Sequence, residues 1–431
     1  MQGLLENWQS GLTHAEYQGV CLAAGDESMH FQDDHGPTYK PNPYFTQWVS
    51  PEFTQPGALL CILPESSKPV TLLTLKFEDY WHAQPNLPDY LSEFVDIRTF
   101  ADSEALAKAA RELCGNQTTA YIGMDPGNEL PGEINPQPLL DYMDFNRAIK
   151  SDYELELMRI ASDIGVAGHK AAEEKFLQGG TEFEIHLAYL AASAQNETAL
   201  PYGNIVALNE HAAILHYQHQ DRHHRSPAKS LLIDAGGQFC GYASDITRTY
   251  VQPGDEHAEF AALLAEMQQH QDRILAQVKP GQSFADLHEF MHRSLCDVLV
   301  AAELVTCDAE TAFEQRVNEK FCPHGLGHLL GIQVHDVGGH LADNNGTPSP
   351  PSDRYPKLRF TREIEIDQVF TIEPGLYFID SLLAEAKQDN APINWQNVEA
   401  LHPYGGIRLE DNVRVLADGC ENLTRDAYAR L

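Results

Sequence analysis

The first 145 residues alternate short apolar runs with one amphipathic helical pattern. The apolar runs lie at residues 19–24, 58–63 and 70–75, and each has the length of a buried strand. Residues 103–113 instead repeat their apolar positions at helical spacing. Because strands and a helix share this part of the chain, we expect an N-terminal α/β domain at residues 1–145.

From residue 152 onward the pattern shows longer helical periods. Apolar residues recur every three to four positions from Asp152 to Lys175, which predicts a long amphipathic helix. Further helices are expected at residues 181–195, 256–277 and 284–302, strands at 204–208, 231–235, 242–251 and 368–378, and a Pro-, Ser- and Gly-rich loop at 344–356. Polar residues around Asn146 separate the two patterns. We therefore expect a second domain, of α/β (α+β) class, at residues 146–431.

Composition narrows the possible partners. The chain has 431 residues, 43% of them apolar, and 29 Lys and Arg against 63 Asp and Glu give a formal net charge of −34. Such a surface repels phosphate backbones and anionic membranes, which argues against nucleic acid or a membrane as a partner. The first residues lack a signal peptide's basic start and apolar centre, and the eight cysteines form no Cys-x-x-Cys pair. We expect a cytoplasmic protein with reduced thiols.

Two aspartates stand in strand-like sequence on either side of a glycine-rich turn. Asp234 ends the run Leu-Leu-Ile-Asp, and Asp245 begins the run Asp-Ile-Thr-Arg-Thr-Tyr. A hairpin can bring the two carboxylates together, and like charges held close in a partly buried site need a proton or a cation. The alternative is that one aspartate caps a turn and the other faces solvent.

Three histidines, His324, His328 and His335, fall within twelve residues of a glycine-laced segment. Gly325 and Gly327 discourage a regular helix and permit close approach of the backbone. A core histidine does not need this freedom, so the segment favours a functional site. Which of the three imidazoles would bind a metal stays open at this point.

Two glutamates, Glu373 and Glu410, lie among strand-forming apolar residues in Phe-Thr-Ile-Glu-Pro-Gly and Gly-Gly-Ile-Arg-Leu-Glu. An unpaired carboxylate in such surroundings costs on the order of several kcal/mol or titrates to neutral. Either glutamate alone could be structural, for instance in an ion pair between Glu410 and Arg408. Together with the two aspartates and one histidine they form a set of O and N ligands without cysteine, which suits Mn²⁺, Co²⁺ or Zn²⁺.

The order Asp, Asp, His, Glu, Glu at positions 234, 245, 328, 373 and 410 resembles the dinuclear metal site of the pita-bread metallopeptidases, which include methionine aminopeptidase, aminopeptidase P and prolidase. Within that group, longer stretches resemble the bacterial Xaa-Pro dipeptidases, a branch that includes the organophosphorus acid anhydrolases. These stretches are Leu200–Asn209, Ile214–Tyr217, Pro323–His328, Val334–Gly338, Phe370–Phe378 and Gly405–Asn412. Shorter matches are Phe31–Asp34 and Tyr80–His82.

The resemblance implies a C-terminal pita-bread catalytic domain that binds two divalent metal ions per subunit, with Mn²⁺ expected ahead of Co²⁺ or Zn²⁺. The implied metal ligands are Asp234, Asp245, His328, Glu373 and Glu410. Asp245 and Glu410 would bridge the two ions, and Glu373 would also be the general base.

The same resemblance implies a set of substrate-binding residues: His216, His335, His324, Arg408, Tyr202 and Asp34. His216 and His335 would hydrogen-bond the substrate and its tetrahedral intermediate, as catalytic residues. Arg408 would meet the substrate carboxylate. Asp34 would reach the substrate ammonium from the neighbouring subunit of a homodimer.

The implied activity is hydrolysis of Xaa-Pro dipeptides, with side hydrolysis of organophosphorus triesters or fluoridates. A close rival is an enzyme of aminopeptidase P type, which releases the first residue from longer peptides. A metal-free binding protein and a creatinase-type amidinohydrolase share the fold, but the filled ligand set argues against both.

One group of histidines is interpreted as having no functional role, and two further features depart from the family pattern. His219, His223 and His224 are interpreted as a solvated loop. His340 stands where an aromatic residue is commoner, which bears on pocket polarity. The N-terminus is short, and only residues 4–12 are available for a helix before the first strand.

Overall fold

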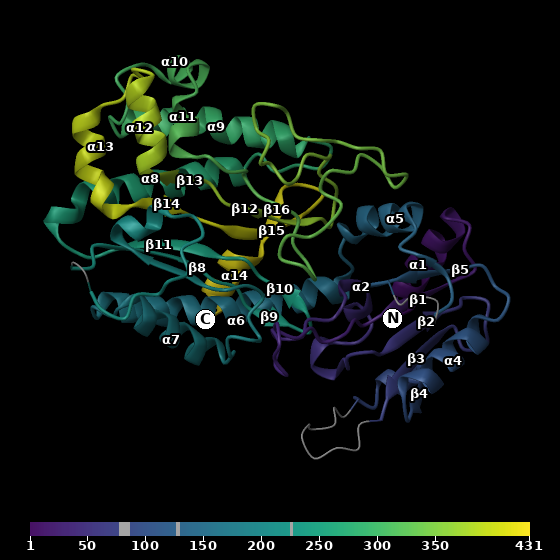
Figure 1. Cartoon of the computed structure of the whole chain (residues 1–431). Helices are drawn as coiled ribbons and strands as arrows, with labels where there is room; N and C mark the ends of the chain where they lie inside the picture. The colour runs from purple at the N-terminus through teal and green to yellow at the C-terminus, as the bar shows by residue number, and fades with distance from the viewer. Residues whose placement is uncertain (77–86, 126–129, 225–226) are drawn as a thin grey trace. The chain divides into compact units, whose positions relative to one another are not determined.

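The computed structural model describes residues 1–76, 87–125, 130–224 and 227–431, so the match at Tyr80–His82 lies outside the described residues. The chain forms two compact units (Figure 1). One unit comprises Met1–Arg147 with Asp343–Thr347, and the other comprises Ala148–Ala342 with Pro348–Leu431. None of the described helices is both long and apolar enough to cross a membrane.

The N-terminal unit is built on a six-stranded mixed sheet with the order β4-β3-β2-β1-β5-β6. Its strands are β1 Gly19–Ala23, β2 Leu59–Ile62, β3 Val70–Leu75, β4 Asp96–Phe100, β5 Thr119–Ile122 and β6 Glu133–Ile134. β2 is antiparallel to both β1 and β3, whereas β1 pairs with β5 and β3 pairs with β4 in parallel. The three apolar runs of the sequence are therefore the adjacent strands β1, β2 and β3.

Both faces of the central strands β1, β2, β3 and β5 are buried, which explains why they lack an alternation of apolar and polar residues. On β1, Val20 and Leu22 belong to a core with residues of α1 (Gln2–His14) and α5 (Gln137–Arg147). The alternate residues Cys21 and Ala23 belong to a second core with α4 (Ser103–Cys114). A helix does precede the first strand, and Trp8 of α1 is fully buried. The other helices among the described residues of the unit are α2 Pro43–Thr46, η1 Pro51–Phe53 and α3 Leu91–Phe94.

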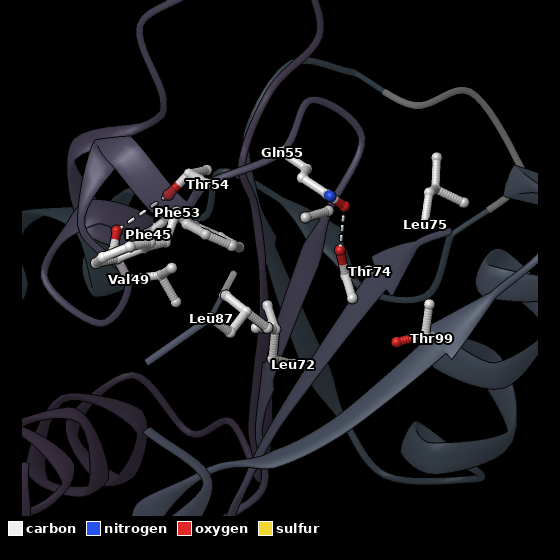
Figure 2. Close-up of a pocket in the computed structure, with 11 residues that line it drawn as sticks. Phe45, Val49, Phe53, Thr54, Gln55, Leu72, Thr74, Leu75, Leu87 and Thr99 are labelled. Carbon is white, nitrogen blue, oxygen red and sulfur yellow. Dashed lines mark hydrogen bonds between the residues drawn. The ribbon is translucent and has the colours of Figure 1, made fainter. Parts of the chain in front are cut away.

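A cavity of about 100 Å³ lies in the N-terminal unit (Figure 2). Its walls are mostly apolar, with Phe45, Val49 and Leu72 among them. Among the polar side chains that line it, Thr74 donates a hydrogen bond to Gln55 and Thr54 donates to backbone carbonyls. None of the described lining residues is titratable, so the cavity offers no acid, base or metal ligand.

The second unit contains several small antiparallel sheets. Its strands are β7 Ile205–Leu208, β8 Ser230–Asp234, β9 Gln238–Phe239, β10 Tyr242–Ala243, β11 Thr247–Val251, β12 Val369–Ile372, β13 Gly375–Tyr377, β14 Gly406–Arg408, β15 Asp411–Val415 and β16 Cys420–Asn422. They pair in the orders β11-β8-β7, β12-β15-β16, β13-β14 and β10-β9. An isolated bridge between Thr247 and Glu410 connects β11 to the segment between β14 and β15.

Helices cover these sheets. They are α6 Asp152–Leu177, α7 Glu182–Ser193, η3 Asn209–Ala213, η4 Asp255–His257, α8 Ala258–Leu275, α9 Phe284–Ala301, α10 Ala309–Glu314, α11 Val317–Phe321, α12 Asp380–Gln388, α13 Trp395–Leu401, η5 His402–Tyr404 and α14 Leu423–Arg430. Helices α6 and α7 run alongside β8 (Figure 1) and share a core with it that includes Phe176, Tyr189 and Ile233. Helices α8 and α9 pack into the largest core, together with β12 to β15.

The first two helices predicted after residue 150, α6 and α7, begin at capping boxes. Ser151 accepts a hydrogen bond from the backbone of Glu154, whose carboxylate accepts the Ser151 N–H at 2.8 Å. Thr181 and Glu184 repeat this reciprocal arrangement at the start of α7. Each box satisfies backbone N–H groups that the first helical turn leaves without partners.

Two strands expected to be continuous are interrupted. The strand expected at 242–251 is divided into β10 and β11, because the intervening Asp245 N–H bonds to the Asn412 side chain at 3.0 Å and leaves the ladder. The strand expected at 368–378 is divided into β12 and β13 at Glu373-Pro374. Proline has no N–H to donate to a ladder. Both interruptions fall at predicted metal ligands.

Candidate metal centre

An antiparallel ladder brings Asp234 and Asp245 together. Asp234 is the last residue of β8, and Thr247 of β11 is its register partner. The N–H of Ala235 donates to the Ile246 carbonyl over 3.0 Å, which continues the pairing beyond the strand ends. Asp245 precedes β11 and lines the same cavity as Asp234.

Glu410 joins this face through Thr247. The Glu410 N–H donates to the Thr247 carbonyl at 3.0 Å, and the Thr247 hydroxyl donates to Oε2 of Glu410 at 2.7 Å. Thr247 thus lies between Asp234 on one side and Glu410 on the other. The spacing of these two carboxylates is set by backbone pairing.

His328 and Glu373 come from a second pairing. The segment around His328 runs along β12, where the Thr371 N–H donates to the His328 carbonyl at 2.9 Å and the Glu373 N–H donates to the Leu326 carbonyl at 2.8 Å. A Cβ at Gly327 would lie 2.0 Å from the Thr371 carbonyl oxygen, so only glycine permits this approach. The glycine pattern of the sequence therefore has a direct steric cause.

The five predicted metal ligands line one cavity of about 550 Å³. Oxygen or nitrogen atoms of Asp245, His328 and Glu410 all lie within 4.8 Å of one another. Nε2 of His328 is 3.4 Å from Oδ2 of Asp245 and 3.8 Å from Oε1 of Glu373. Beside these ligands, His216, His324, His335, His340 and Arg408 also line the cavity.

Arg408 donates hydrogen bonds to other side chains of the protein through three of its five N–H groups. Nη2 donates to Oδ2 of Asp234 at 2.7 Å, Nη1 to the Tyr377 hydroxyl at 3.1 Å, and Nε to the Thr247 hydroxyl at 3.1 Å. The Tyr377 hydroxyl also lies 2.8 Å from Nε2 of His324. The two N–H groups that remain leave Arg408 able to meet a substrate carboxylate.

The other predicted substrate residues lie in different places. Tyr202 donates its hydroxyl to Oδ1 of Asp245 at 2.6 Å. His335 packs edge-on against His328, with ring centroids 4.5 Å apart, and the following Asp336 is held by buried Lys150 at 3.3 Å. Asp34 is exposed in the N-terminal unit. Its expected role involves a second subunit and stays a prediction.

The protein-family model "Metallopeptidase family M24" matches residues 156–417, and the model "Xaa-Pro dipeptidase, N-terminal domain" matches residues 1–145. The chain belongs to the M24 metallopeptidases. It is 44% identical to the Xaa-Pro dipeptidase of Aeromonas hydrophila, over 95% of this chain and 93% of the relative. It is 40% identical to Xaa-Pro dipeptidase 2 of Idiomarina loihiensis, over 98% of this chain and 96% of the relative.

Solved structures show the same fold in this M24 enzyme. Pseudomonas aeruginosa aminopeptidase PepP matches with a TM-score of 0.75 at 21% identity, over 99% of this chain and 95% of that one. Zinc-substituted Escherichia coli aminopeptidase P matches with a TM-score of 0.74 at 22% identity, over 98% of this chain and 95% of that one. The mixed α/β architecture and its C-terminal pita-bread domain, expected from the sequence, are confirmed.

The ligand groups of this metallopeptidase fit divalent cations. Within the described part of the chain, Oδ1 of Asp234 is buried and accepts no hydrogen bond. Nδ1 of His328 lies 3.0 Å from the Leu329 carbonyl, so its proton points to the backbone and the Nε2 lone pair is left toward the carboxylates. An orphaned carboxylate oxygen and an oriented imidazole are both ready metal donors.

Charge in the cavity supports the same conclusion. Burial, followed by the charges of Asp245 and Glu373, raises the pKa of Glu410 well above its ordinary value. Burial likewise raises the pKa of Glu373 to about 7 and raises the pKa of Asp234 against the opposing charge of Arg408. These carboxylates are destabilised as anions by burial and by one another, which a bound cation would relieve.

Asp245 behaves differently from the other carboxylates. Burial alone would raise its pKa, but the hydrogen bond and charge of His328, with the Tyr202 hydroxyl, outweigh burial and the pKa is lowered. Burial alone would lower the pKa of His328, but its contact with Asp245, with the charge of Glu373, outweighs burial and the pKa is raised. Burial and the charge of Arg408 lower the pKa of His324 to about 4, so that imidazole is neutral near pH 7.

Sequence reasoning missed three residues that organise the site: Thr247, Thr371 and Tyr377. Thr371 accepts the His328 N–H at 3.1 Å, in addition to its backbone contacts. Each of the three lies two or four residues from a predicted ligand on a strand. For Thr247 and Thr371 the period of two along a strand was the signal that could have found them, because it places them on the face of the ligands. Tyr377 lies in β13, beyond the interruption at Glu373-Pro374, and had no such signal.

Proposed function

We propose that this M24 metallopeptidase is an Xaa-Pro dipeptidase whose two divalent ions, most readily Mn²⁺, are held by Asp234, Asp245, His328, Glu373 and Glu410. The observation that carries the proposal is the gathering of all five O and N ligands on one cavity of about 550 Å³. The names of relatives that match at 40–45% identity along nearly the whole chain support the substrate class.

A dedicated site suits this substrate. A peptide bond to proline has no N–H, so a protease that docks an extended backbone loses a contact there. Two bound divalent ions would lower the pKa of a water, orient it and polarise the scissile carbonyl. Glu373, which lines the cavity with the other ligands, would take a proton from that water and hand it toward the proline nitrogen.

The remaining cavity residues would bind the substrate. His216 and His335 line the cavity from separate loops and would donate to the carbonyl oxygen as its charge develops. Arg408 would bind the carboxylate of the proline, held for that task by Asp234 and Tyr377. Tyr202 would hold the metal ligand Asp245 in place through its hydroxyl hydrogen bond. His324 would line the substrate side of the cavity.

A panel of peptides tests the proposal. The purified protein, supplied with Mn²⁺, is expected to hydrolyse Ala-Pro well, Ala-Pro-Ala poorly and Ala-Leu least. Faster release of alanine from Ala-Pro-Ala than from Ala-Pro would favour an aminopeptidase P type activity, which the structural neighbours carry in their names. Failure to cleave any Xaa-Pro peptide would contradict the proposal.

A side activity on organophosphorus triesters or fluoridates is also proposed. Their phosphorus is already tetrahedral, so groups arranged for a tetrahedral carbon intermediate would serve them. Fluoride release from a dialkyl fluorophosphate measures it, and release should stop when Glu373 is changed to Gln. No release above the metal-only rate would rule the activity out.

Two further properties stay proposals: a homodimer and a cytoplasmic location. The dimer rests on the resemblance, in which Asp34 acts across subunits. The location is an expectation from the sequence pattern, and cell fractionation would test it.

A further inference from the structure

Glu182, at the first position of α7, is a buried carboxylate with four hydrogen-bond donors. It is 2% exposed. Oε1 accepts from the Leu208 N–H at 2.9 Å and lies 2.7 Å from Nδ1 of His211. Oε2 accepts from the Tyr217 hydroxyl at 2.9 Å and from the Asp221 N–H at 2.7 Å.

All four donors belong to one segment, residues 208–221. Near its middle stands His216, which lines the metal cavity. The Tyr217 ring, next in the chain, also stacks on the His211 ring with centroids 4.4 Å apart. A single carboxylate therefore holds this segment before His216, directly after it and at its far end.

The same cluster could be considered a metal site, because ligand atoms of Glu182, His211 and Asp221 lie within 4.8 Å of one another. A carboxylate offers about four lone-pair positions. The four donors fill all of them, so a cation would have to displace one of these contacts. The geometry favours a hydrogen-bonded anchor over a metal ligand.

We propose that Glu182 is a positioning residue, which fixes His216 at the substrate cavity by organising residues 208–221. The proposal rests on the proposed function, in which His216 contacts the substrate. Glu182 itself lies outside the residues that line the cavity. It acts on the reaction through the segment that it holds.

The test variant is Glu182→Gln. Glutamine keeps the size of the side chain but replaces one acceptor oxygen with an NH₂ donor, which faces two donors of the segment. Residues 208–221 should exchange their amide hydrogens faster, and kcat/KM for Ala-Pro should fall roughly 10- to 100-fold, because small misplacement of a catalytic group is costly. The matched control is Glu184→Gln, which weakens the cap of the same helix without contacting the segment.

A double-mutant cycle separates positioning from general stability. Glu182→Gln should cost little in a His216→Ala background, because the residue that it positions is already absent. An equal loss of kcat/KM in both backgrounds would overturn the proposal. So would a similar loss in Glu184→Gln, or a lower metal content in Glu182→Gln, which would make the cluster a metal site.

Hydrogen exchange distinguishes this proposal from the proposed function. If the protein cleaved no Xaa-Pro peptide, or if His216→Ala left hydrolysis unchanged, the function or the role of His216 would be wrong. Faster exchange confined to residues 208–221 in Glu182→Gln would still support the anchor. Unchanged exchange there would refute the anchor whatever the activity.

Discussion

Nη2 of Arg408 lies 2.7 Å from Oδ2 of Asp234, and both side chains are largely buried. The contact joins a predicted metal ligand to the residue proposed to bind the substrate carboxylate. Removing one partner of such a buried pair leaves an uncompensated charge. Arg408 and Asp234 should therefore depend on each other in both metal binding and catalysis.

Arg408→Lys is expected to lower kcat/KM for Ala-Pro about 100-fold. A lysine cannot replace the guanidinium's contacts to Asp234, Tyr377 and Thr247 while also meeting a carboxylate. The loss should be smaller for Ala-prolinamide, which has no carboxylate to bind. Steady-state kinetics on the two substrates check this, and an equal loss on both would show that Arg408 does not bind the carboxylate.

Removal of metal should abolish hydrolysis. The chelated protein should regain activity with Mn²⁺ more fully than with Zn²⁺, because an O-rich ligand set suits the harder ion. Assays after dialysis against each ion, with metal content measured in parallel, check both expectations. Full activity at no measurable metal content would contradict them.

Glu373→Gln and Asp245→Asn should differ in what they lose. Glu373→Gln is expected to lower kcat by about 10²-fold or more while keeping part of the metal, because it removes the proposed base. Asp245→Asn is expected to lose metal as well as activity, because Asp245 is within reach of both His328 and Glu410. Metal analysis beside single-turnover kinetics separates the two. Normal turnover in Glu373→Gln would assign the base elsewhere.

Asp34→Asn should weaken hydrolysis of Ala-Pro and spare an uncharged phosphotriester, which has no ammonium to bind. The comparison of kcat/KM on the two substrates is the measurement. Because Asp34 is proposed to act from the neighbouring subunit, sedimentation should also show a dimer at micromolar concentration. Equal effects on both substrates, or a species of 48.0 kDa alone, would remove Asp34 from the site.

Stability should fall in acid because of buried histidines in the second unit. Burial lowers the pKa of His270 to about 3, and burial with the charge of His288 lowers the pKa of His292 to about 2. In the unfolded chain histidine titrates near 6.5. The stability that the two neutral histidines contribute is thus complete above about pH 6.5. It is lost as the pH falls toward 3, because the unfolded chain takes up protons first.

Each of these histidines should lower the free energy of unfolding by about 2 kcal/mol when the pH falls from 7.5 to 5. Urea unfolding at the two pH values measures the loss. His270→Asn retains a polar group near Ser294, which lies 3.0 Å from Nδ1 of His270, but does not titrate. The variant should lose less stability on acidification, and an unchanged pH dependence would refute this account.

The long elements could be predicted from sequence because local patterning and packing agree in them. The helix expected at 152–175 is α6, Asp152–Leu177, and the helix expected at 284–302 is α9, Phe284–Ala301. In both helices the residues of the apolar stripe are buried in the core, and a capping side chain stands at the first turn. The prediction of continuous strands at 242–251 and 368–378 was wrong. Their interruptions depend on partners distant in sequence, such as Asn412 for Asp245.

The candidate site shows the same division. Motif residues could be picked out because carboxylates and glycines are conspicuous in apolar strands. Tyr377 could not, because a tyrosine within an apolar strand is indistinguishable from core until its hydroxyl is seen between His324 and Arg408. Glu182 likewise begins a helix, where an acidic residue is ordinary, and its contacts come from a loop 26 to 39 residues away.

The position of Thr247 between Asp234 and Glu410 has a consequence for how this scaffold can diverge. The main chain sets the spacing of the two carboxylates through ladder hydrogen bonds that need no ion. A descendant chain could therefore exchange the acidic side chains for others and inherit the frame intact. Chemistry and architecture can be lost separately here, so a related fold with unrelated activity requires only a few substitutions at strand ends.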